Sequence, residues 1–366
     1  MPYNFSMASL DIVRQRLRNQ HLTEAIFKKP GEVVGWLGAV QAQDYAGAKW
    51  AVGQRLKGTG ITDAVIEQAF TDGAILRTHL LRPTWHFVTP ADIRWLLELT
   101  APRVNAVNAY MYRKLELDEA IFKRCNAALT KALQGGQQLM RAEIVKVLEQ
   151  ARIAASGLRF GYLLMRAELD GVICSSARRG KQFTYALLEE RAPPAKKLKR
   201  DEALFELARR YFATRGPATA QDFVWWSGLT LTDARKGLEM IRSQFESERV
   251  GEQTYWFPAS GPLPNEAKPT AHLLPNYDEY FIGFRDRSAI GDRVKTSTSE
   301  ERSTALNAHI IVINGQVVGG WKRTLQKNTA VIETNFITPL TKAENRAVAV
   351  AAEKYGAFLE LPVVMA

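Results

Sequence analysis

Two glutamines that are spaced two residues apart are the first feature of the chain that could do chemistry. The segment Gln41-Ala-Gln43 is followed directly by Asp44. In an α-helix, residues i and i+2 lie about 200° apart, whereas in an extended segment both face the same side. If both amides serve one pocket, the helix that starts at Glu32 must end near Val40. The alternative is that they only satisfy backbone groups near a helix end or face solvent.

The elements that must position these residues follow an order that recurs along the chain. In the clearest stretch, Asp118 caps an apolar-periodic helix that Gly135-Gly136 ends. We predict the following helices at 141–150 and 158–169, then strands at 172–175 and 182–187 around the basic loop 177–181. Three helices followed by a hairpin are typical of a winged helix, a relative of the helix-turn-helix modules that enter a DNA groove.

Two further stretches show a similar order without an exact sequence repeat, so their assignment rests on the order of elements. In the later stretch we predict helices at 201–214, 219–226 and 232–245 and a strand at 254–257. In the first stretch we predict helices at 9–18, 32–40 and 62–70 and two strands within 75–88. The chain thus contains three predicted winged-helix units.

The carboxyl-terminal part differs in character. After several prolines, the run 309–324 predicts two strands joined by a type I′ turn at Asn314-Gly315. A third strand is expected at 330–336 and an Ala-rich helix at 342–355. We therefore predict a fold that is mainly α with β wings (α+β), in four parts. The parts are 1–116, 117–192 and 193–258 as winged-helix units 1 to 3, and 259–366 as an α+β sheet domain.

Composition restricts the class of protein. The chain has 366 residues and 49 Lys and Arg against 38 Asp and Glu, a net charge of +11 that suits a polyanionic partner. Its two cysteines, Cys125 and Cys174, are far apart in sequence, which argues against a disulfide framework or a cysteine zinc site. No run of ~18 apolar residues occurs. We expect a cytoplasmic protein without a membrane span, associated with the nucleoid when bound to DNA.

Basic residues gather in the second unit and after it. Arg178, Arg179 and Lys181 form the tip of the predicted hairpin, and Lys196 and Lys197 lie in a linker whose prolines oppose helix formation. Such a run is either a solvated face or a track for phosphates. We favour DNA contact for the hairpin, because its tip can enter a groove while its side chains hold phosphate.

Other polar residues have competing interpretations. Alternation places Arg82, Thr84 and His86 on one face of a strand, where they either support the glutamine segment or contact DNA. Adjacent carboxylates at Asp278 and Glu279 point oppositely on an extended strand. We interpret them as buried ion pairs to an arginine, such as Arg285, and not as an acid/base pair.

The histidines and the paired tryptophans give weaker signals. The five histidines have no ligand spacing such as H-E-x-x-H, so we predict no metal site. Trp225-Trp226 at helical spacing is more typical of a core than of a base-stacking platform.

Taken together, the motifs resemble those of the tandem winged-helix DNA glycosylases related to the azinomycin-resistance and crosslink-repair glycosylases. The resemblance spans about residues 10 to 345. It rests on the Gln-x-Gln at 41–43, Arg-Thr-His-Leu-Leu-Arg-Pro-Thr-Trp-His-Phe-Val at 77–88 with Asp92 and Trp95-Leu-Leu97, Leu-Pro-Asn-Tyr-Asp-Glu-Tyr at 274–280 with Asp286-Arg-Ser288, and Gly315-x-Val-Val-Gly-x-Trp-x-Arg323.

The resemblance implies a C-shaped arrangement of the three units and the sheet domain around a basic channel for duplex DNA. It further implies hydrolysis of the N-glycosidic bond of N7-alkylated purines, including the unhooking of interstrand crosslinks in some members. One branch of the family carries Gln-x-Gln and the other Gln-x-Asp, and this chain is similar to the first. We assign Gln41 and Gln43 as water-positioning residues and Asp44 as an electrostatic helper. Arg323 joins the residues expected to bind DNA.

A neutral amide is sufficient for this reaction. Glutamine does not titrate and is no general base. An N7-alkylated purine is already a cation and leaves as a neutral base, so the barrier lies mostly in forming an oxocarbenium-like sugar. Two amide oxygens can hold a water beneath the anomeric carbon and face the developing charge. Undamaged purines should therefore be poor substrates.

We accordingly expect a monofunctional DNA glycosylase, without a cofactor, that acts as a monomer on double-stranded DNA carrying alkylated purines. The main alternative is a non-catalytic winged-helix DNA-binding protein, such as a transcriptional regulator, in which the glutamines are structural. A protein that binds a small toxic alkylating compound is a further alternative, which the positive charge disfavours.

Overall fold

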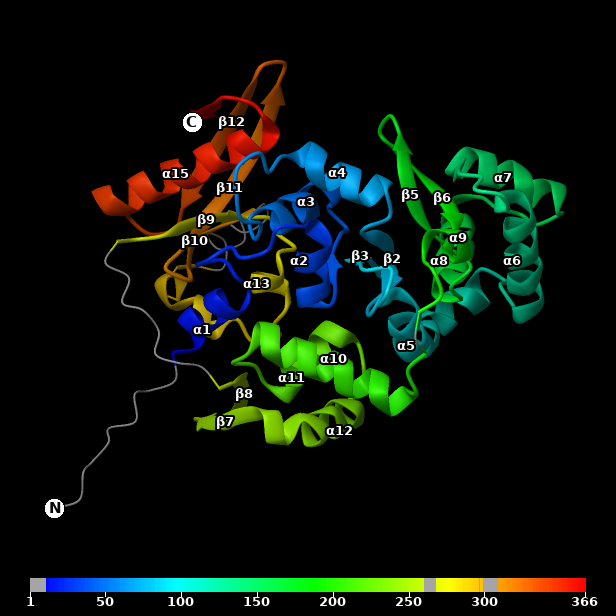
Figure 1. Cartoon of the computed structure of the whole chain (residues 1–366), viewed down its shortest axis with the longest axis horizontal. Coiled ribbons are helices and arrows are strands. Elements are labelled where there is room, and N and C mark those ends of the chain that lie inside the picture. Colours follow the sequence, from blue (N-terminus) through cyan, green and yellow to red (C-terminus); the bar gives the residue numbers. More distant parts are fainter. Residues whose placement is uncertain (1–10, 196, 260–267, 296, 299–308) are drawn as a thin grey trace.

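The structure is a computed structural model that describes residues 11–195, 197–259, 268–295, 297–298 and 309–366. It is a mixed α+β fold, and Figure 1 shows its elements along the chain. Within the described residues, no helix has the length and apolar character needed to cross a membrane.

The first region contains the glutamine segment. Its elements are α1 (Ile12–Asn19), α2 (Pro30–Leu37), β1 (Val40–Gln41), α3 (Tyr45–Gly53), α4 (Asp63–Thr71), β2 (Leu76–Leu80), β3 (Thr84–Val88) and α5 (Ile93–Lys114). Helix α2 ends at Leu37, earlier than the predicted 40, because Gly38 takes a φ of +76° and turns the chain. The prediction omitted α3 and the 22-residue α5.

The second region agrees closely with its predicted elements. It consists of α6 (Glu119–Leu133), β4 (Leu139–Met140), α7 (Arg141–Gln150), α8 (Gly157–Leu169), β5 (Ile173–Arg179), β6 (Gln182–Leu187) and α9 (Leu188–Arg191). Asp118 caps α6 by accepting a hydrogen bond from the Ile121 backbone at 2.8 Å. The β5–β6 hairpin forms with the basic residues at its tip, as expected. In Figure 1 this region forms the lobe at the right.

The third region ends in a strand pair of which the prediction found only one member. It contains α10 (Arg200–Arg215), α11 (Ala220–Ser227), α12 (Leu231–Ile241), a 3₁₀ turn at Arg242–Gln244, β7 (Phe245–Val250) and β8 (Gln253–Pro258). The helix predicted at 232–245 stops at Ile241, because residues 245–250 pair as a strand with β8. Thr219 caps α11 as predicted.

The carboxyl-terminal region builds a second large sheet. Its elements are β9 (Ala271–Leu274), α13 (Glu279–Ile282), 3₁₀ turns at Ser288–Ile290 and Asp292–Val294, β10 (His309–Ile313), β11 (Gln316–Gln326), β12 (Thr329–Phe336), α15 (Lys342–Leu359) and β13 (Val363–Met365). Asn314 and Gly315 have φ values of +48° and +79°, which confirms the predicted type I′ turn. Both β9 and β13, which lie at the sheet edges, were absent from the prediction.

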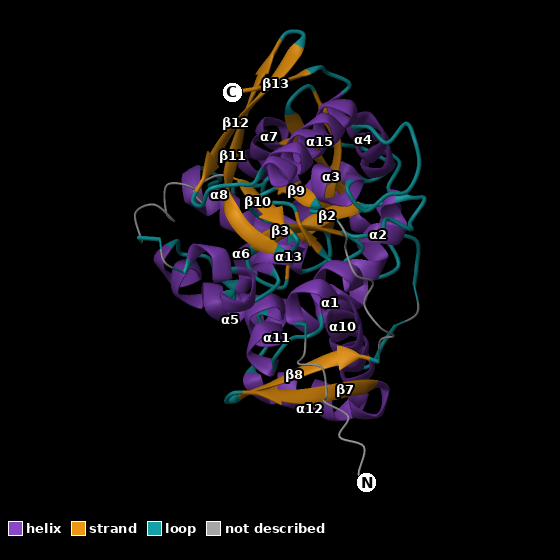
Figure 2. Ribbon diagram, turned by 90° about the vertical axis from the view of Figure 1, so that its left-hand side faces the viewer, coloured by secondary structure: helices purple, strands orange, loops and turns teal. Residues whose placement is uncertain are grey.

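The sheets connect regions that are far apart in sequence. Strands of the first and second regions form one six-stranded sheet in the order β1-β3-β2-β5-β6-β4, joined by pairing of Arg77 with Ser175. The five-stranded sheet has the order β13-β12-β11-β10-β9, and α15 packs on it. The β7–β8 pair lies at the end of the molecule opposite to β13 (Figure 2).

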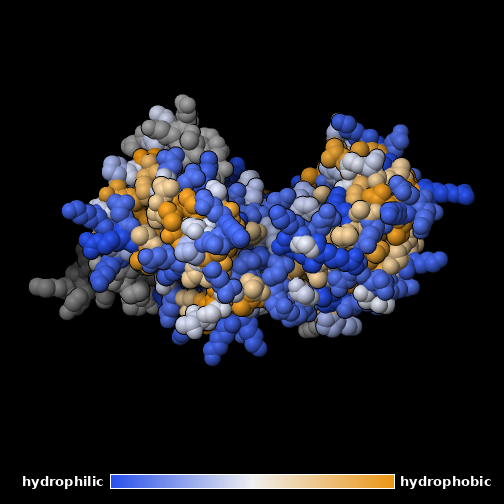
Figure 3. All heavy atoms as spheres, turned by 90° about the horizontal axis from the view of Figure 1, so that it is seen from above, coloured by the Kyte–Doolittle hydropathy of each residue, from blue (hydrophilic) through white to orange (hydrophobic). Residues whose placement is uncertain are grey.

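The hydrophobic cores also cross the region boundaries. One core joins α2 to β3 with the five-stranded sheet and α15, and a second joins β2, β3 and α5 with α10 to α12. By contrast, α6 to α8 and the β5–β6 hairpin bury a core of their own. The glutamine segment therefore sits in a framework shared by three regions. Seen from above, the surface is hollowed between the lobe of α6 to α8 and the rest of the molecule (Figure 3).

Candidate active site

Gln41 lies at the end of the short strand β1, and Gln43 lies in the bend that follows it. The preceding helix ends at Leu37, as the use of both amides requires. Gln41 pairs with His86 across β1 and β3. Val40 and Ala42 are fully buried in the core beneath. Because successive side chains of a strand alternate, Gln41 projects away from that core. Gln41 is 6% exposed and Gln43 is exposed, so the segment leads from the interior to the surface.

Buried charges fix the backbone of this segment. The Gln41 N–H donates to Glu279 Oε1 at 2.9 Å, and the Ala42 carbonyl accepts from Arg77 Nε at 3.1 Å. Arg215 donates to the carbonyls of Leu37 and Ala39 at 2.9 and 3.2 Å, which holds the turn before β1. Four backbone groups around the glutamines are thus hydrogen-bonded to charged side chains, which holds the segment rigid.

The carboxylates of Asp278 and Glu279 form buried ion pairs, as predicted, but with partners other than Arg285. Glu279 Oε2 accepts from Arg215 Nη2 at 2.6 Å, and Asp278 accepts from both terminal nitrogens of Arg55 at 2.8 and 2.9 Å. All four side chains are fully buried. Arg285 is exposed and donates to Gln221 Oε1 at 3.2 Å. Arg285 was therefore the wrong partner. The true partners are Arg55, between α3 and α4, and Arg215, at the end of α10, and both are far from Asp278 and Glu279 in sequence.

Arg82 is the charged side chain that reaches the glutamines directly. Its Nη2 donates to Gln41 Oε1 at 3.3 Å. Arg82 lies in the turn between β2 and β3, where Leu81 takes a φ of +57°. It therefore precedes β3, the strand on which we had predicted it together with Thr84 and His86. Burial lowers the pKa of the Arg82 guanidinium, and the charge of Glu279 acts against that effect.

An exposed tryptophan packs beside Arg82. Trp226 is fully buried and donates to Glu279 Oε2 at 2.8 Å, in agreement with the predicted core role. Trp225, in contrast, is 42% exposed, and the Arg82 guanidinium lies 5.3 Å from its ring centroid. Sequence reasoning missed this difference, because helix periodicity alone does not show which of two adjacent indoles faces outward.

His86 is fully buried, and its position favours structural support of the glutamine segment over DNA contact. Its Nδ1 lies 3.0 Å from the Thr84 carbonyl oxygen, so that nitrogen carries the proton. Burial lowers the pKa of His86 to about 3, and the nearby Arg82 charge acts in the same direction. The ring is therefore neutral at physiological pH.

Asp44 has a structural partner of its own. Its Oδ1 accepts the Gly47 backbone N–H at 3.0 Å and caps α3. A side chain at Gly47 would lie 2.4 Å from Asp44 Oδ2, so this tight cap also requires glycine. The carboxylate is therefore held next to Gln43 by the start of a helix.

The basic residues of the β5–β6 hairpin differ in their surroundings. Arg178 is half-buried and pairs with Glu67 at 3.4 Å, which ties the hairpin to α4. Arg179 is exposed and pairs with Glu143 at 3.2 Å. Lys181 is exposed at the tip. Of the three, Lys181 thus presents its charge to solvent most freely.

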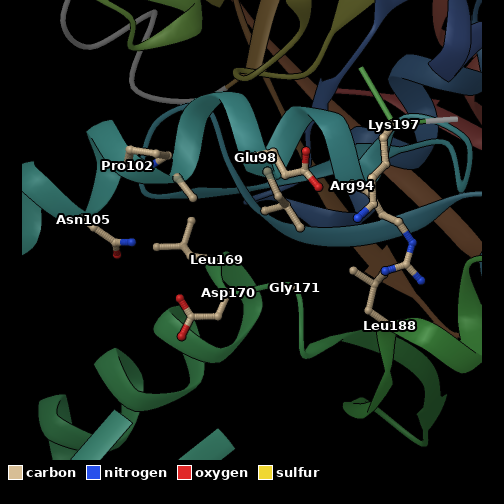
Figure 4. A pocket seen from close by; sticks show the side chains of 11 residues that line it. Arg94, Glu98, Pro102, Asn105, Leu169, Asp170, Gly171, Leu188 and Lys197 are labelled. Atoms are coloured by element: carbon tan, nitrogen blue, oxygen red, sulfur yellow. The ribbon is translucent and has the colours of Figure 1, made fainter. Parts of the chain in front are cut away.

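Lys197 and Arg323 lie in different surroundings. Lys197 helps to line a cavity of about 430 Å³ between α5 and the end of α8, with Arg94, Glu98 and Asp170 (Figure 4). Arg323 on β11 is half-buried and donates to the Tyr355 hydroxyl. Lys196, which we also predicted to bind DNA, lies outside the described residues.

Both cysteines are buried in hydrophobic cores. Burial raises the pKa of both Cys125 and Cys174 to about 12, so both thiols stay protonated. Among the described residues, no group of three or more His, Cys, Asp and Glu has the geometry of a metal site.

With this geometry established, comparison with known proteins identifies the family. Residues 34–358 match the AlkZ-like DNA glycosylase family. The chain belongs to the AlkZ-like DNA glycosylases. Among solved structures, it is similar to Streptomyces sahachiroi DNA glycosylase AlkZ, with 21% identity, 97% of this chain and 98% of that chain covered, and a TM-score of 0.77. No curated protein matched. Membership confirms the resemblance inferred from the motifs, and the structural match extends the AlkZ-like fold over nearly the whole chain.

Proposed function

We propose that this protein is a monofunctional DNA glycosylase that hydrolyses the N-glycosidic bond of N7-alkylated purines. Its membership of the AlkZ-like family supports DNA as the substrate and glycosylase chemistry as the reaction class. The observation that carries the proposal is the glutamine segment with its hydrogen-bonded backbone, in which Gln41 lies beside Arg82 and Gln43 is exposed at the surface. Both amides lie outside a helix and are only two residues apart, and we propose that they bind one water molecule.

The reaction follows from the charge of the lesion. Oxygen of the bound water attacks the anomeric carbon while the glycosidic bond breaks. The bonding electrons pass to the purine, where they neutralise the positive charge of the alkylated ring, and the water proton is lost to solvent. Gln41 and Gln43 orient the water and face the oxocarbenium-like sugar with their oxygen dipoles. Asp44 adds a negative charge from its cap on α3.

His86 takes no proton in this scheme. It is buried and neutral, and its hydrogen bond to Thr84 supports the strand that pairs with Gln41. Of the carboxylates near the glutamines, Asp278 and Glu279 are held in ion pairs and Asp44 caps α3. A cationic base leaves without protonation and needs no general acid, so the proposed substrates are cationic lesions.

We further propose that the first three regions act as winged-helix units at 1–116, 117–192 and 193–258, and that 259–366 forms a sheet domain. Together they would enclose a basic channel around duplex DNA in a C-shaped arrangement. The hollow in Figure 3 and the exposed hairpin residue Lys181 support this arrangement. The same channel, open at its side, would admit bulky or crosslinked adducts without full base flipping. Arg178, Arg179, Lys181, Lys197 and Arg323 are the proposed phosphate contacts of a monomer.

Release of N7-methylguanine from a duplex oligonucleotide tests this function. We expect release by the wild type and a loss of at least about 100-fold in Gln41→Ala and in Gln43→Ala. Gln150→Ala is the matched control, because Gln150 is an exposed amide at the end of α7. Sequence-selective DNA binding without base release would instead support the alternative, a winged-helix regulator with structural glutamines.

A further inference from the structure

Two neighbouring arginines, Arg82 and Arg287, have no carboxylate counter-charge among the described residues, and Arg82 contacts Gln41. Arg82 and Arg287 are both partly buried, yet among the described residues neither forms an ion pair with a carboxylate. By comparison, Arg55, Arg210 and Arg215 each pair with an Asp or Glu within 2.9 Å. The buried Arg16 and Arg77 also lack a carboxylate partner in the described part of the chain, but neither shares an aromatic ring with a second unpaired guanidinium. A desolvated charge without a partner is costly, so an unpaired pair of guanidiniums is a site for an anion.

Trp225 brings these two guanidiniums together. The Arg82 guanidinium lies 5.3 Å and that of Arg287 lies 5.8 Å from the centroid of its ring. Burial lowers the pKa of Arg287, and the positive charge of Arg82 lowers it further, which reflects how close the two charges are. The Trp225 ring is anchored in turn, because its Nε1 donates to the Ile282 carbonyl at 3.2 Å.

The nearest carboxylates are already committed to other groups. Glu279 accepts from Arg215 and Trp226. Asp222 accepts the backbone N–H groups of Arg285 and Asp286 at 2.9 and 3.1 Å and also caps α11. Neither carboxylate forms a hydrogen bond with Arg82 or Arg287. The two guanidiniums therefore retain free N–H donors, and Arg82 Nε has no partner at all among the described residues.

Close backbone packing sets the geometry of the cluster. Gly228 ends α11 with a φ of +70°, and a Cβ atom there would lie 2.5 Å from the Leu81 carbonyl oxygen. The end of α11 thus presses directly on the turn that carries Arg82. On the other side, Arg287 Nε donates to the Phe281 carbonyl at 2.8 Å, which fixes that arginine against α13. Three separate segments hold the cluster in place.

We infer that Arg82 and Arg287, held by Trp225, bind the DNA phosphate next to the alkylated nucleotide and so place its sugar against Gln41. This inference rests on the proposed glycosylase function. Guanidinium groups match the oxygens of a phosphodiester, and two of them compensate its charge where water is partly excluded. Since Arg82 Nη2 also contacts Gln41 Oε1 at 3.3 Å, the bound phosphate and the water-positioning amide share one side chain. Trp225 is a positioning residue in this arrangement.

A duplex with one uncharged linkage tests the inference. Single-turnover base release is measured on three duplexes that carry one N7-methylguanine. One is unmodified, one has a methylphosphonate on the 5′ side of the lesion and one has it on the 3′ side. For the wild type we expect a loss of about 10- to 100-fold with one of the two methylphosphonates, the effect of removing a charge-assisted hydrogen bond.

The variants show whether the arginines sense that same phosphate. On the unmodified duplex, the rate of base release by Arg287→Ala and by Arg82→Ala should be lower than that of the wild type by a similar factor. The sensitive methylphosphonate should then lower the rate of each variant by less than about threefold further. Arg285→Ala, an exposed neighbour outside the cluster, should keep the full wild-type sensitivity. The phosphate site would be refuted if the losses from the substitution and from the methylphosphonate multiplied, or if both variants kept the wild-type rate. Either result would leave the proposed glycosylase function unaffected. If the wild type releases no base from the unmodified duplex, the proposed function fails and this inference fails with it.

Discussion

Glu279 accepts the backbone N–H of Gln41 across 238 positions of sequence, at 2.9 Å and without exposure to solvent. Its other oxygen binds Arg215 and Trp226. One carboxylate thus joins the glutamine segment to α10 and α11. The Glu279 carboxylate and the Arg215 guanidinium are both fully buried, so each charge is stabilised by the other.

Replacing Glu279 with Gln should destabilise the protein strongly. The change leaves the Arg215 charge buried without its partner, and we expect a loss of about 3–5 kcal/mol in the free energy of unfolding. Urea unfolding followed by circular dichroism measures it. Glu239→Gln is the control, because its partner Arg242 is 3.9 Å away and both side chains are largely exposed. An equal effect of the two substitutions would show that burial of the pair contributes nothing.

Gln43→Asp should retain base release from N7-methylguanine, within about tenfold of the wild type. A carboxylate accepts hydrogen bonds from water as an amide oxygen does, and it also faces the developing positive charge of the sugar. The exposed position of Gln43 allows the charge to be solvated in the free protein. Single-turnover release measured beside Gln43→Ala checks this. If the aspartate variant were as inactive as the alanine variant, water positioning at residue 43 would be refuted.

Local signals in the sequence were enough to predict the parts of the fold that depend on near neighbours. The Asn314-Gly315 turn required only two residues that tolerate positive φ, and both adopt it. Asp118 predicted the start of α6 in the same way, as a side chain that bonds a backbone N–H three residues on. The end of α2 at Leu37 agrees with the condition that the spacing of Gln41 and Gln43 sets for a shared pocket.

Long-range partners could not be predicted, because they have no periodicity in the sequence. Nothing near Glu279 indicates that it binds Gln41, and Arg285 was the nearer but wrong partner for that acidic pair. Trp225 and Trp226 have the same local pattern, and only the packing of α11 separates the exposed indole from the buried one. Residues 245–250 follow a helix without a strong stop signal, and their strand pairing with β8 decides their conformation.

Acidification should reduce stability through buried histidines. Burial lowers the pKa of His86 to about 3 and those of His272 and His309 to about 4, from 6.5. Below pH 6.5 these histidines therefore bind protons in the unfolded chain but stay neutral in the folded chain. The free energy of unfolding is therefore highest above pH 6.5. It decreases as the pH falls towards 4, by about 1.4 kcal/mol per pH unit for each histidine.

Unfolding free energies at pH 8, 6.5 and 5.5 measure this dependence. His86→Gln should remove the His86 share of this dependence between pH 6.5 and 5.5, while His21, His272 and His309, whose pKa values are also lowered, keep the rest. The comparison uses the slope against pH, so a uniform loss of stability in the variant does not affect it. Identical slopes for the variant and the wild type would contradict the assignment of His86 as a buried neutral ring.

Lys181→Ala should weaken binding to duplex DNA and reduce its salt dependence. If the exposed Lys181 ammonium neutralises one phosphate, the slope of log K against log salt should become less steep by about 0.9. Fluorescence anisotropy on an undamaged duplex over a range of salt concentrations measures the slope without any chemistry. Lys236→Ala is the matched control, because its ammonium already pairs with Asp201 at 2.6 Å on another region. An unchanged slope in Lys181→Ala would remove the β5–β6 hairpin from the proposed DNA interface, while leaving the glutamine segment as the candidate active site.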